Sequence, residues 1–157
     1  MVSWKAFLLR VYVVLLSLMS LNGLAAGMSS VKEVAIKEYD PVAYFKVGKA
    51  LKGNKAFTFE WHNLIWYFDN QENRDLFAKS PEKYSPQYDG YCAWAMVEGK
   101  KSQSDPTVWK IVNGKLYLLC SKEAYTEWSK NIPGNIEKAD VNWLKLISSH
   151  PEKGFSG

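Results

Sequence analysis

Two β-hairpin patterns, each made of two short apolar runs joined by two turn residues, constrain the fold of this chain more than any other feature. In the first, residues 56–61 and 64–68 flank the dipeptide His62-Asn63. Such runs on either side of two turn residues are typical of a hairpin. His62 then lies at an exposed tip, where a single histidine is more typical of a solvated turn than of a ligand. The expected cross-strand pairs are Trp61 with Leu64, Phe59 with Trp66 and Phe57 with Phe68, all on one apolar face.

The second hairpin pattern surrounds Asn113-Gly114, which is the strongest short hairpin signal in a sequence. It joins residues 109–112 to residues 115–120. This register places Trp109 and Ile111 on one face with Leu116, Leu118 and Cys120, so Cys120 is predicted to point into the core.

Helices are predicted between and after the hairpins from capping residues and helical spacing. Asp40 before Pro41 reads as the start of a short helix, and Asp69 or Asn70 can cap a helix over 70–79. Ser121 caps another helix, Pro133-Gly134 breaks it, and Asn135 can cap the last one. Local hairpins followed by helices predict an α+β fold, here a small single domain with two β-hairpins and several short helices.

The N-terminus has the three-part pattern of a secretory signal peptide. Basic Lys5 and Arg10 precede an apolar run at 11–21, and small residues follow up to Gly27. This order predicts cleavage near Ala26 and a periplasmic or secreted protein, whereas an uncleaved anchor needs about 20 apolar residues. The expected organisation is a signal peptide at 1–26, a flexible lead-in at 27–37, a domain at 38–147 and a tail at 148–157, with no stable membrane span after cleavage.

The charge of the cleaved chain argues against nucleic acid as a partner. Without Lys5 and Arg10, the 20 basic residues become 18, against 16 acidic residues, and the charges are interspersed.

Both cysteines, Cys92 and Cys120, remain after the expected cleavage. An exported protein meets a compartment that permits disulfides, so these two residues are a candidate bridge. Cys92 also follows the turn Asp89-Gly90 and precedes a helix-like run at 93–97. If that helix starts near Gly90, Cys92 lies in its first turn, where free N–H groups and the helix dipole favour the thiolate.

Eight short blocks follow one another over about residues 38–144, at 39–45, 66–68, 72–75, 81–84, 87–94, 105–106, 113–118 and 132–136. In this order they resemble the YHS domain family, with the chain as a stand-alone exported member. Two positions depart from the family pattern: Tyr91-Cys92-Ala93 replaces the Tyr-His-Ser triplet, and Cys120 stands where many members carry another residue. The resemblance implies a module of a family with metal-associated members, without an assigned reaction for the exported ones.

Three functions remain open from the residues. The first is a structural or ligand-binding module without catalysis, whose partner is a small ligand or a protein. The second is a metal-handling protein for copper or zinc, because soft thiolates select these metals, although a zinc site usually has four ligands. The third is an enzyme with Cys92 as nucleophile, which needs a nearby base that neither histidine supplies. The predicted ligand-binding residues are Cys92, Tyr91, Tyr88, Asp89 and Trp94, with Cys92 as the metal ligand and no catalytic residue.

Overall fold

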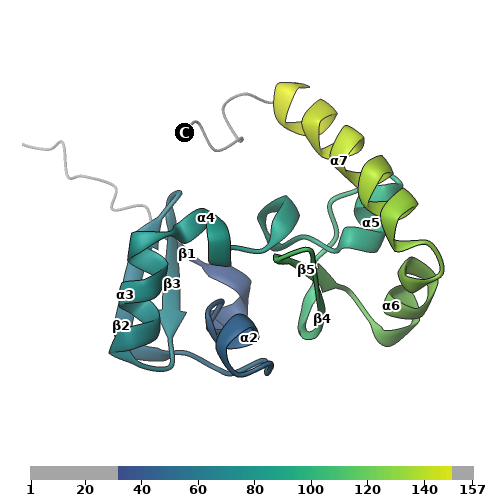
Figure 1. Cartoon of the computed structure of the whole chain (residues 1–157). Coiled ribbons are helices and arrows are strands. Elements are labelled where there is room, and N and C mark those ends of the chain that lie inside the picture. The colour runs from purple at the N-terminus through teal and green to yellow at the C-terminus, as the bar shows by residue number, and fades with distance from the viewer. Residues whose placement is uncertain (1–31, 150–157) are drawn as a thin grey trace, which may run out of the picture. The chain divides into compact units, whose positions relative to one another are not determined.

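Two small sheets, several short helices and one longer C-terminal helix make up residues 32–149, the part of the chain that this structure, a computed structural model, describes (Figure 1). The predicted α+β fold is confirmed. The expected signal peptide lies outside the described residues, as does most of the expected tail. In chain order, the elements are β1 (Glu33–Val34), η1 (Ala35–Glu38), α2 (Ala43–Lys46), β2 (Asn54–Trp61), β3 (Leu64–Phe68), α3 (Gln71–Lys79), α4 (Pro81–Tyr84), η2 (Gln87–Gly90), α5 (Ala93–Val97), β4 (Asp105–Val112), β5 (Lys115–Leu119), α6 (Lys122–Ser129) and α7 (Ile132–Ser149).

The first sheet has the strand order β1-β3-β2, with α3 packed on it (Figure 1). The hairpin β2–β3 turns at His62 and Asn63, and both residues have positive φ, as a two-residue type I′ turn requires. The predicted pairs of Trp61 with Leu64 and of Phe59 with Trp66 are confirmed. The predicted pair of Phe57 with Phe68 is wrong, because a bulge shifts the register and Asn54 pairs with Phe68.

Residues 33–37, which lie in the predicted flexible lead-in, form β1 and, together with Glu38, η1. Glu33 pairs with Leu64 and Val34 with Ile65, in parallel to β3. Ala35 is buried in the same core as the sheet. No sequence pattern marks this strand, because a two-residue parallel pairing has no turn of its own and no detectable alternation.

The second sheet is the hairpin β4–β5, whose turn at Asn113-Gly114 is confirmed. Trp109 pairs with Leu118 and Ile111 with Leu116, in the predicted register, and β4 begins at Asp105, four residues before the predicted start of this strand. β5 is buried on both sides. Leu116 and Leu118 face one cluster with Tyr44, whereas Tyr117 and Leu119 face a second cluster around Trp128.

The starts of α3 and α6 agree with the capping residues predicted from the sequence, whereas α2 begins at Ala43, two residues after the predicted first residue Pro41, and α7 begins earlier than predicted. Asn70 and Ser121 accept hydrogen bonds from the backbone at the first turns of α3 and α6, as caps do. α7 begins at Ile132, before the expected break, because Pro133 is tolerated in a first helical turn. Asn131 accepts from the N–H of Gly134, at 3.3 Å, and takes the place expected for Asn135. Asn135 is buried and donates to the carbonyl of Trp128 at 2.8 Å instead.

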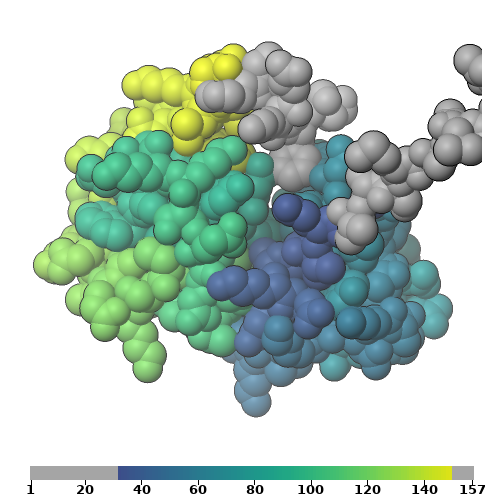
Figure 2. Space-filling model, turned by 180° about the vertical axis from the view of Figure 1, so that it is seen from behind, coloured from purple at the N-terminus to yellow at the C-terminus, as the bar shows by residue number. Residues whose placement is uncertain are grey.

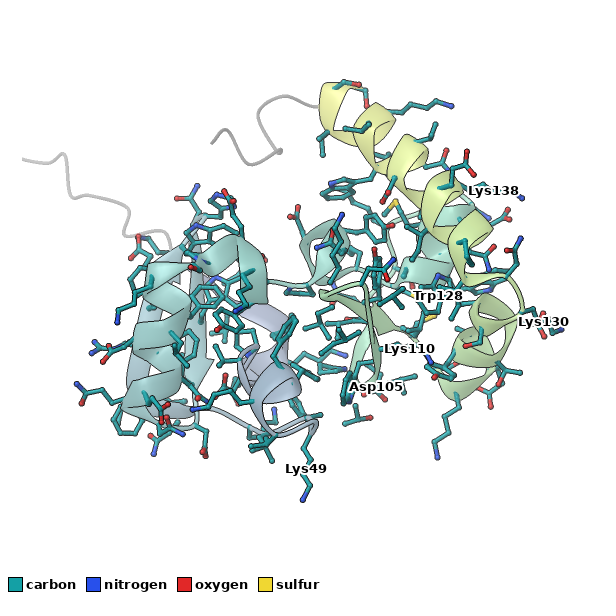
Figure 3. The ribbon with its side chains drawn as sticks, viewed as in Figure 1. Lys49, Asp105, Lys110, Trp128, Lys130 and Lys138 are labelled. Carbon is teal, nitrogen blue, oxygen red and sulfur yellow. The ribbon has the colours of Figure 1, made fainter. Side chains whose placement is uncertain are left out.

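The buried side chains form three neighbouring clusters within one compact unit. Ile36 and Phe45 pack against both the first-sheet cluster and the Leu116–Leu118 cluster, so these two are continuous. In the space-filling view, the blue elements and the green elements adjoin (Figure 2). Trp128 points between α6 and the β4–β5 hairpin, whereas Lys49 and Lys130 extend outward (Figure 3). None of the helices described within residues 32–149 has the length and apolar character of a bilayer span.

Candidate functional site

Residues 86–92, here called the strap, cross β5 and are attached to it at both ends. At one end, Pro86 makes an isolated parallel bridge with Leu116. At the other end, the sulfur of Cys92 lies 2.7 Å from the sulfur of Cys120, the first residue after β5. The strap is therefore closed onto a strand that is buried on both faces.

The backbone of the strap adopts a conformation that side chains disfavour. Tyr88 and Asp89 have φ of 57° and 52°, in the left-handed region. Gly90 follows with φ 77°, and a Cβ there would come within 2.9 Å of the Ile36 side chain. Ser104 donates its hydroxyl to the carbonyl of Gly90 at 2.6 Å, which helps to fix this turn. Consecutive left-handed residues persist only where their surroundings hold them.

Cys92 and Cys120 lie together as the sequence allowed, but Cys92 is not in the first turn of a helix. It is the N-cap residue of α5, its side chain is fully buried, and its N–H donates to Ser102 O at 2.9 Å. Its sulfur accepts the backbone N–H of Cys120 at 3.0 Å. Cys120 is half-buried, and burial followed by the neighbouring Cys92 raises the pKa of its thiol to about 11.

A cavity of about 100 Å³ lies between the tip of the first hairpin and the strap. The hairpin contributes Trp61, His62, Leu64 and Trp66, and the strap with its preceding residue contributes Ser85, Pro86 and Asp89. The walls are mostly aromatic and apolar. The imidazole of His62 stacks on the ring of Trp61, with centroids 3.7 Å apart and planes 15° apart.

Two titratable groups line this cavity, and burial shifts both. Burial raises the pKa of the Asp89 carboxyl from 3.8 to about 6, while Lys101 acts in the opposite direction. Burial lowers the pKa of His62 below 6.5, against a smaller opposite effect of Glu82. At neutral pH the cavity therefore carries an ionised carboxylate beside a neutral imidazole.

The sequence-predicted site residues do not meet in one place. Only Asp89 lines the cavity. Tyr88 is buried on the other side of the strap, where its hydroxyl donates to Asp140 Oδ1 at 2.7 Å, and both burial and this bond raise its pKa. Tyr91 and Trp94 are half-buried and pack against the cluster around Trp128, and Lys101 Nζ lies 5.2 Å from the Tyr91 ring centroid.

The hairpin half of the cavity was missed by sequence reasoning. The prediction that His62 lies at an exposed tip is wrong, because its stacking on Trp61 leaves it half-buried. Trp61, Leu64 and Trp66 were assigned to the core alone, and they do pack there. The one signal available in the sequence was a histidine between two aromatic strands. The other wall of the cavity that His62 lines comes from the strap, more than twenty residues later in the chain.

Neither a metal centre among the described residues nor a similarity to known proteins points to a function. No group of three or more His, Cys, Asp or Glu side chains within residues 32–149 is arranged to hold a metal ion. Comparison of the chain with protein-family models, curated proteins and solved structures finds no match.

Proposed function

We propose that this chain is an exported, YHS-like ligand-binding module that holds a small organic cation in the cavity between the β2–β3 tip and the strap. Export rests on the signal-peptide pattern of the first 26 residues, and the family on the sequence blocks that resemble YHS domains. The ligand site rests on the composition of the cavity walls.

The observation that carries the ligand class is an acidic group set among aromatic rings. Asp89 supplies one carboxylate, and Trp61 and Trp66 supply apolar walls. A carboxylate in a partly desolvated aromatic site attracts a cation through charge, and the rings attract it through their quadrupole. His62 adds no opposing charge at neutral pH, because its pKa is lowered.

The volume of the cavity limits the size of this ligand. Drug-sized molecules occupy pockets of about 300–1,000 Å³, whereas this cavity measures about 100 Å³. It therefore suits a ligand of a few heavy atoms, such as an alkylammonium group, either free or as the end of a larger molecule.

Metal handling through Cys92 receives less support than cation binding. Its side chain is fully buried, and its sulfur already contacts Cys120 and accepts the Cys120 N–H. A soft metal would need at least one further ligand and a path to this sulfur. An enzyme with Cys92 as nucleophile would in addition need a base. Of the two histidines in the sequence, His62 lines the cavity and His150 belongs to the expected tail.

A titration with tetramethylammonium chloride, followed by two-dimensional NMR of the exported protein at constant ionic strength, tests the proposal. We expect saturable shifts of the Trp61 and Trp66 indole signals, and weaker effects from the neutral analogue tert-butanol. Asp89→Asn should weaken binding by about tenfold, the effect of losing roughly 1.4 kcal/mol of charge interaction.

Asp75→Asn is the matched control, because Asp75 is a partly exposed carboxylate on α3 that does not line the cavity. It should bind tetramethylammonium as the unmodified protein does. The proposal fails if the indole signals do not move, or if Asp89→Asn and Asp75→Asn bind equally.

A further inference from the structure

We infer that Cys92 and Cys120 form a disulfide that clamps the strap onto β5. The inference does not depend on the identity of the cavity ligand. It rests on the position of the two sulfur atoms, on the way in which the strap is attached, and on the unequal exposure of the two cysteines.

The two sulfur atoms lie close to the distance of a disulfide bond. They are 2.7 Å apart, less than 1 Å beyond the roughly 2.05 Å of a disulfide bond. Cys92 is held on its own side by the hydrogen bond from its N–H to Ser102 O, and Cys120 directly follows Leu119 of β5. The bridge would thus join two well-packed elements.

The attachment of the strap shows what the bridge would hold. Without it, the strap is held along β5 by the Pro86–Leu116 bridge, by the packing of Tyr88 on Tyr117 and by the hydrogen bond from the Cys120 N–H to the Cys92 sulfur. Ser104 and Ser102 hold the carbonyl of Gly90 and the N–H of Cys92. Between these points the chain carries two consecutive left-handed residues, Tyr88 and Asp89. A covalent bond next to this turn would oppose its relaxation to a more favourable backbone conformation.

The two cysteines differ in their exposure to solvent, and this difference sets the order in which they would react. Cys120 is half-buried whereas Cys92 is fully buried, so an incoming disulfide oxidant meets Cys120 first. The Cys120 thiol loses its proton and attacks one sulfur of the oxidant, which releases one thiolate and leaves a mixed disulfide. Cys92 then loses its proton and attacks the Cys120 sulfur, releasing the second thiolate. The protein loses two protons and two electrons, and the oxidant becomes two thiols.

The hydrogen bond to Cys92 bears on the second of these steps. The N–H of Cys120 points to the Cys92 sulfur at 3.0 Å and stabilises negative charge on it, which favours the attacking Cys92 thiolate. Reduction would follow the same route in reverse, because a reductant also meets the half-buried Cys120 first and releases the Cys92 thiolate. The bridge is therefore reducible through Cys120, while burial protects Cys92 from direct attack.

The test is thiol counting by intact mass on protein exported to an oxidising compartment and denatured with an alkylating reagent. We expect no alkylation before reduction and two alkylated cysteines after it. Thermal unfolding should then show a midpoint lower by on the order of 10 °C after reduction. Two alkylated thiols in the unreduced protein would overturn the inference.

Hydrogen exchange locates the effect of the bridge. The Tyr91 N–H, which donates to Tyr88 O within the strap, should exchange faster in reduced protein than in oxidised protein. The variant Cys120→Ser should exchange at the reduced rate in both conditions, with no effect of reductant on its unfolding midpoint. If reduction leaves both the midpoint and the Tyr91 exchange rate unchanged, the bridge is no clamp and the inference is wrong.

Discussion

Asp40 is the residue whose chemical identity the surrounding structure specifies most fully. Its side chain is completely buried, and its Oδ1 accepts the N–H groups of Val42 and Ala43 at 2.8 Å and 3.3 Å. Its Oδ2 accepts the N–H of Asp69 at 2.8 Å and the side-chain amide of Asn73 at 2.6 Å. One carboxylate therefore joins the start of α2 to the end of the first hairpin and to α3.

Asp40→Ala is expected to lower the free energy of unfolding by about 3 kcal/mol, because four donors lose a charged acceptor in a buried site. Asp40→Asn should also destabilise the fold, since one amide group would face donors rather than accept from them. Urea unfolding measures both. Asp75→Asn, at a partly exposed position, is the control and should change stability little. Equal midpoints for Asp40→Ala and the control would contradict this role.

Asp89 gives the fold a pH dependence of known sign. Its pKa rises from 3.8 to about 6 on folding, so the folded chain holds this proton more tightly than the unfolded chain between these values. The free energy of unfolding should therefore fall as the pH rises through this window, by about 1 kcal/mol once solvent screening of a partly exposed group is allowed for.

The measurement compares urea unfolding of the unmodified protein and of Asp89→Asn at several pH values. His62, in the same cavity, contributes with the opposite sign, because its lowered pKa makes protonation unfavourable as the pH falls. Glu82 acts on His62 and Lys101 acts on Asp89, and both are present in the two proteins. The difference between the two curves thus isolates Asp89, and a difference that does not vary with pH would rule out its titration.

These residues also show how far sequence alone reaches at this scale. The cap at Asp40 was predictable, because Val42 and Ala43 lie two and three residues further along the chain. The contacts of the same carboxylate with Asp69 and Asn73 span 29 and 33 residues, and no local pattern marks them. Similarly, the acidic turn at Asp89 was visible as a candidate site, but the aromatic rings opposite it were not.

At the scale of elements, turns were predicted better than the strands that lead away from them. The two-residue turns at His62-Asn63 and Asn113-Gly114 fix the adjacent pairs, which agree with the structure. Further from each turn, a bulge shifts the register, between Asn54 and Thr58 in one hairpin and between Asp105 and Trp109 in the other. Bulges depend on tertiary packing, which local sequence patterns do not show. The pattern of apolar residues therefore predicted which face of β2 is buried, but not the residue that pairs with Phe68.

Asn142 connects two helices and carries a prediction at this scale. From α7, its side-chain amide donates to the carbonyls of Met96 and Val97, in the last turn of α5, at 3.1 Å and 3.0 Å. Asn142→Ala should lower the free energy of unfolding by about 1–2 kcal/mol, because the Val97 carbonyl loses this donor and the Met96 carbonyl keeps the N–H of Gly99 alone among the hydrogen bonds described. Lys145→Ala, at an exposed position of the same helix, is the comparison in thermal unfolding. An equal loss of free energy of unfolding in both variants would contradict this role, because water would then satisfy the two carbonyls as well as the amide does.

At the scale of the whole described unit, β5 connects the buried clusters. Leu116 and Leu118 point to the cluster that shares Ile36 and Phe45 with the first sheet. Tyr117 and Leu119 point to the cluster that includes Trp128 and helices α5 to α7. The sequence predicted one buried face of this strand, because alternation assigns the other face to solvent; the burial of both faces follows from helices that come later in the chain.

If β5 couples these clusters, a cavity in one should destabilise both. Leu118→Ala is expected to cost about 3 kcal/mol, since Leu118 is fully buried. Under conditions where exchange reports the equilibrium, protected amides of β3 and of α6 should then exchange about 100-fold faster, by the same factor in both elements. The result that contradicts this is a change confined to one of them, because the clusters would then unfold separately. Leu144→Ala, at an exposed position of α7, should change neither rate.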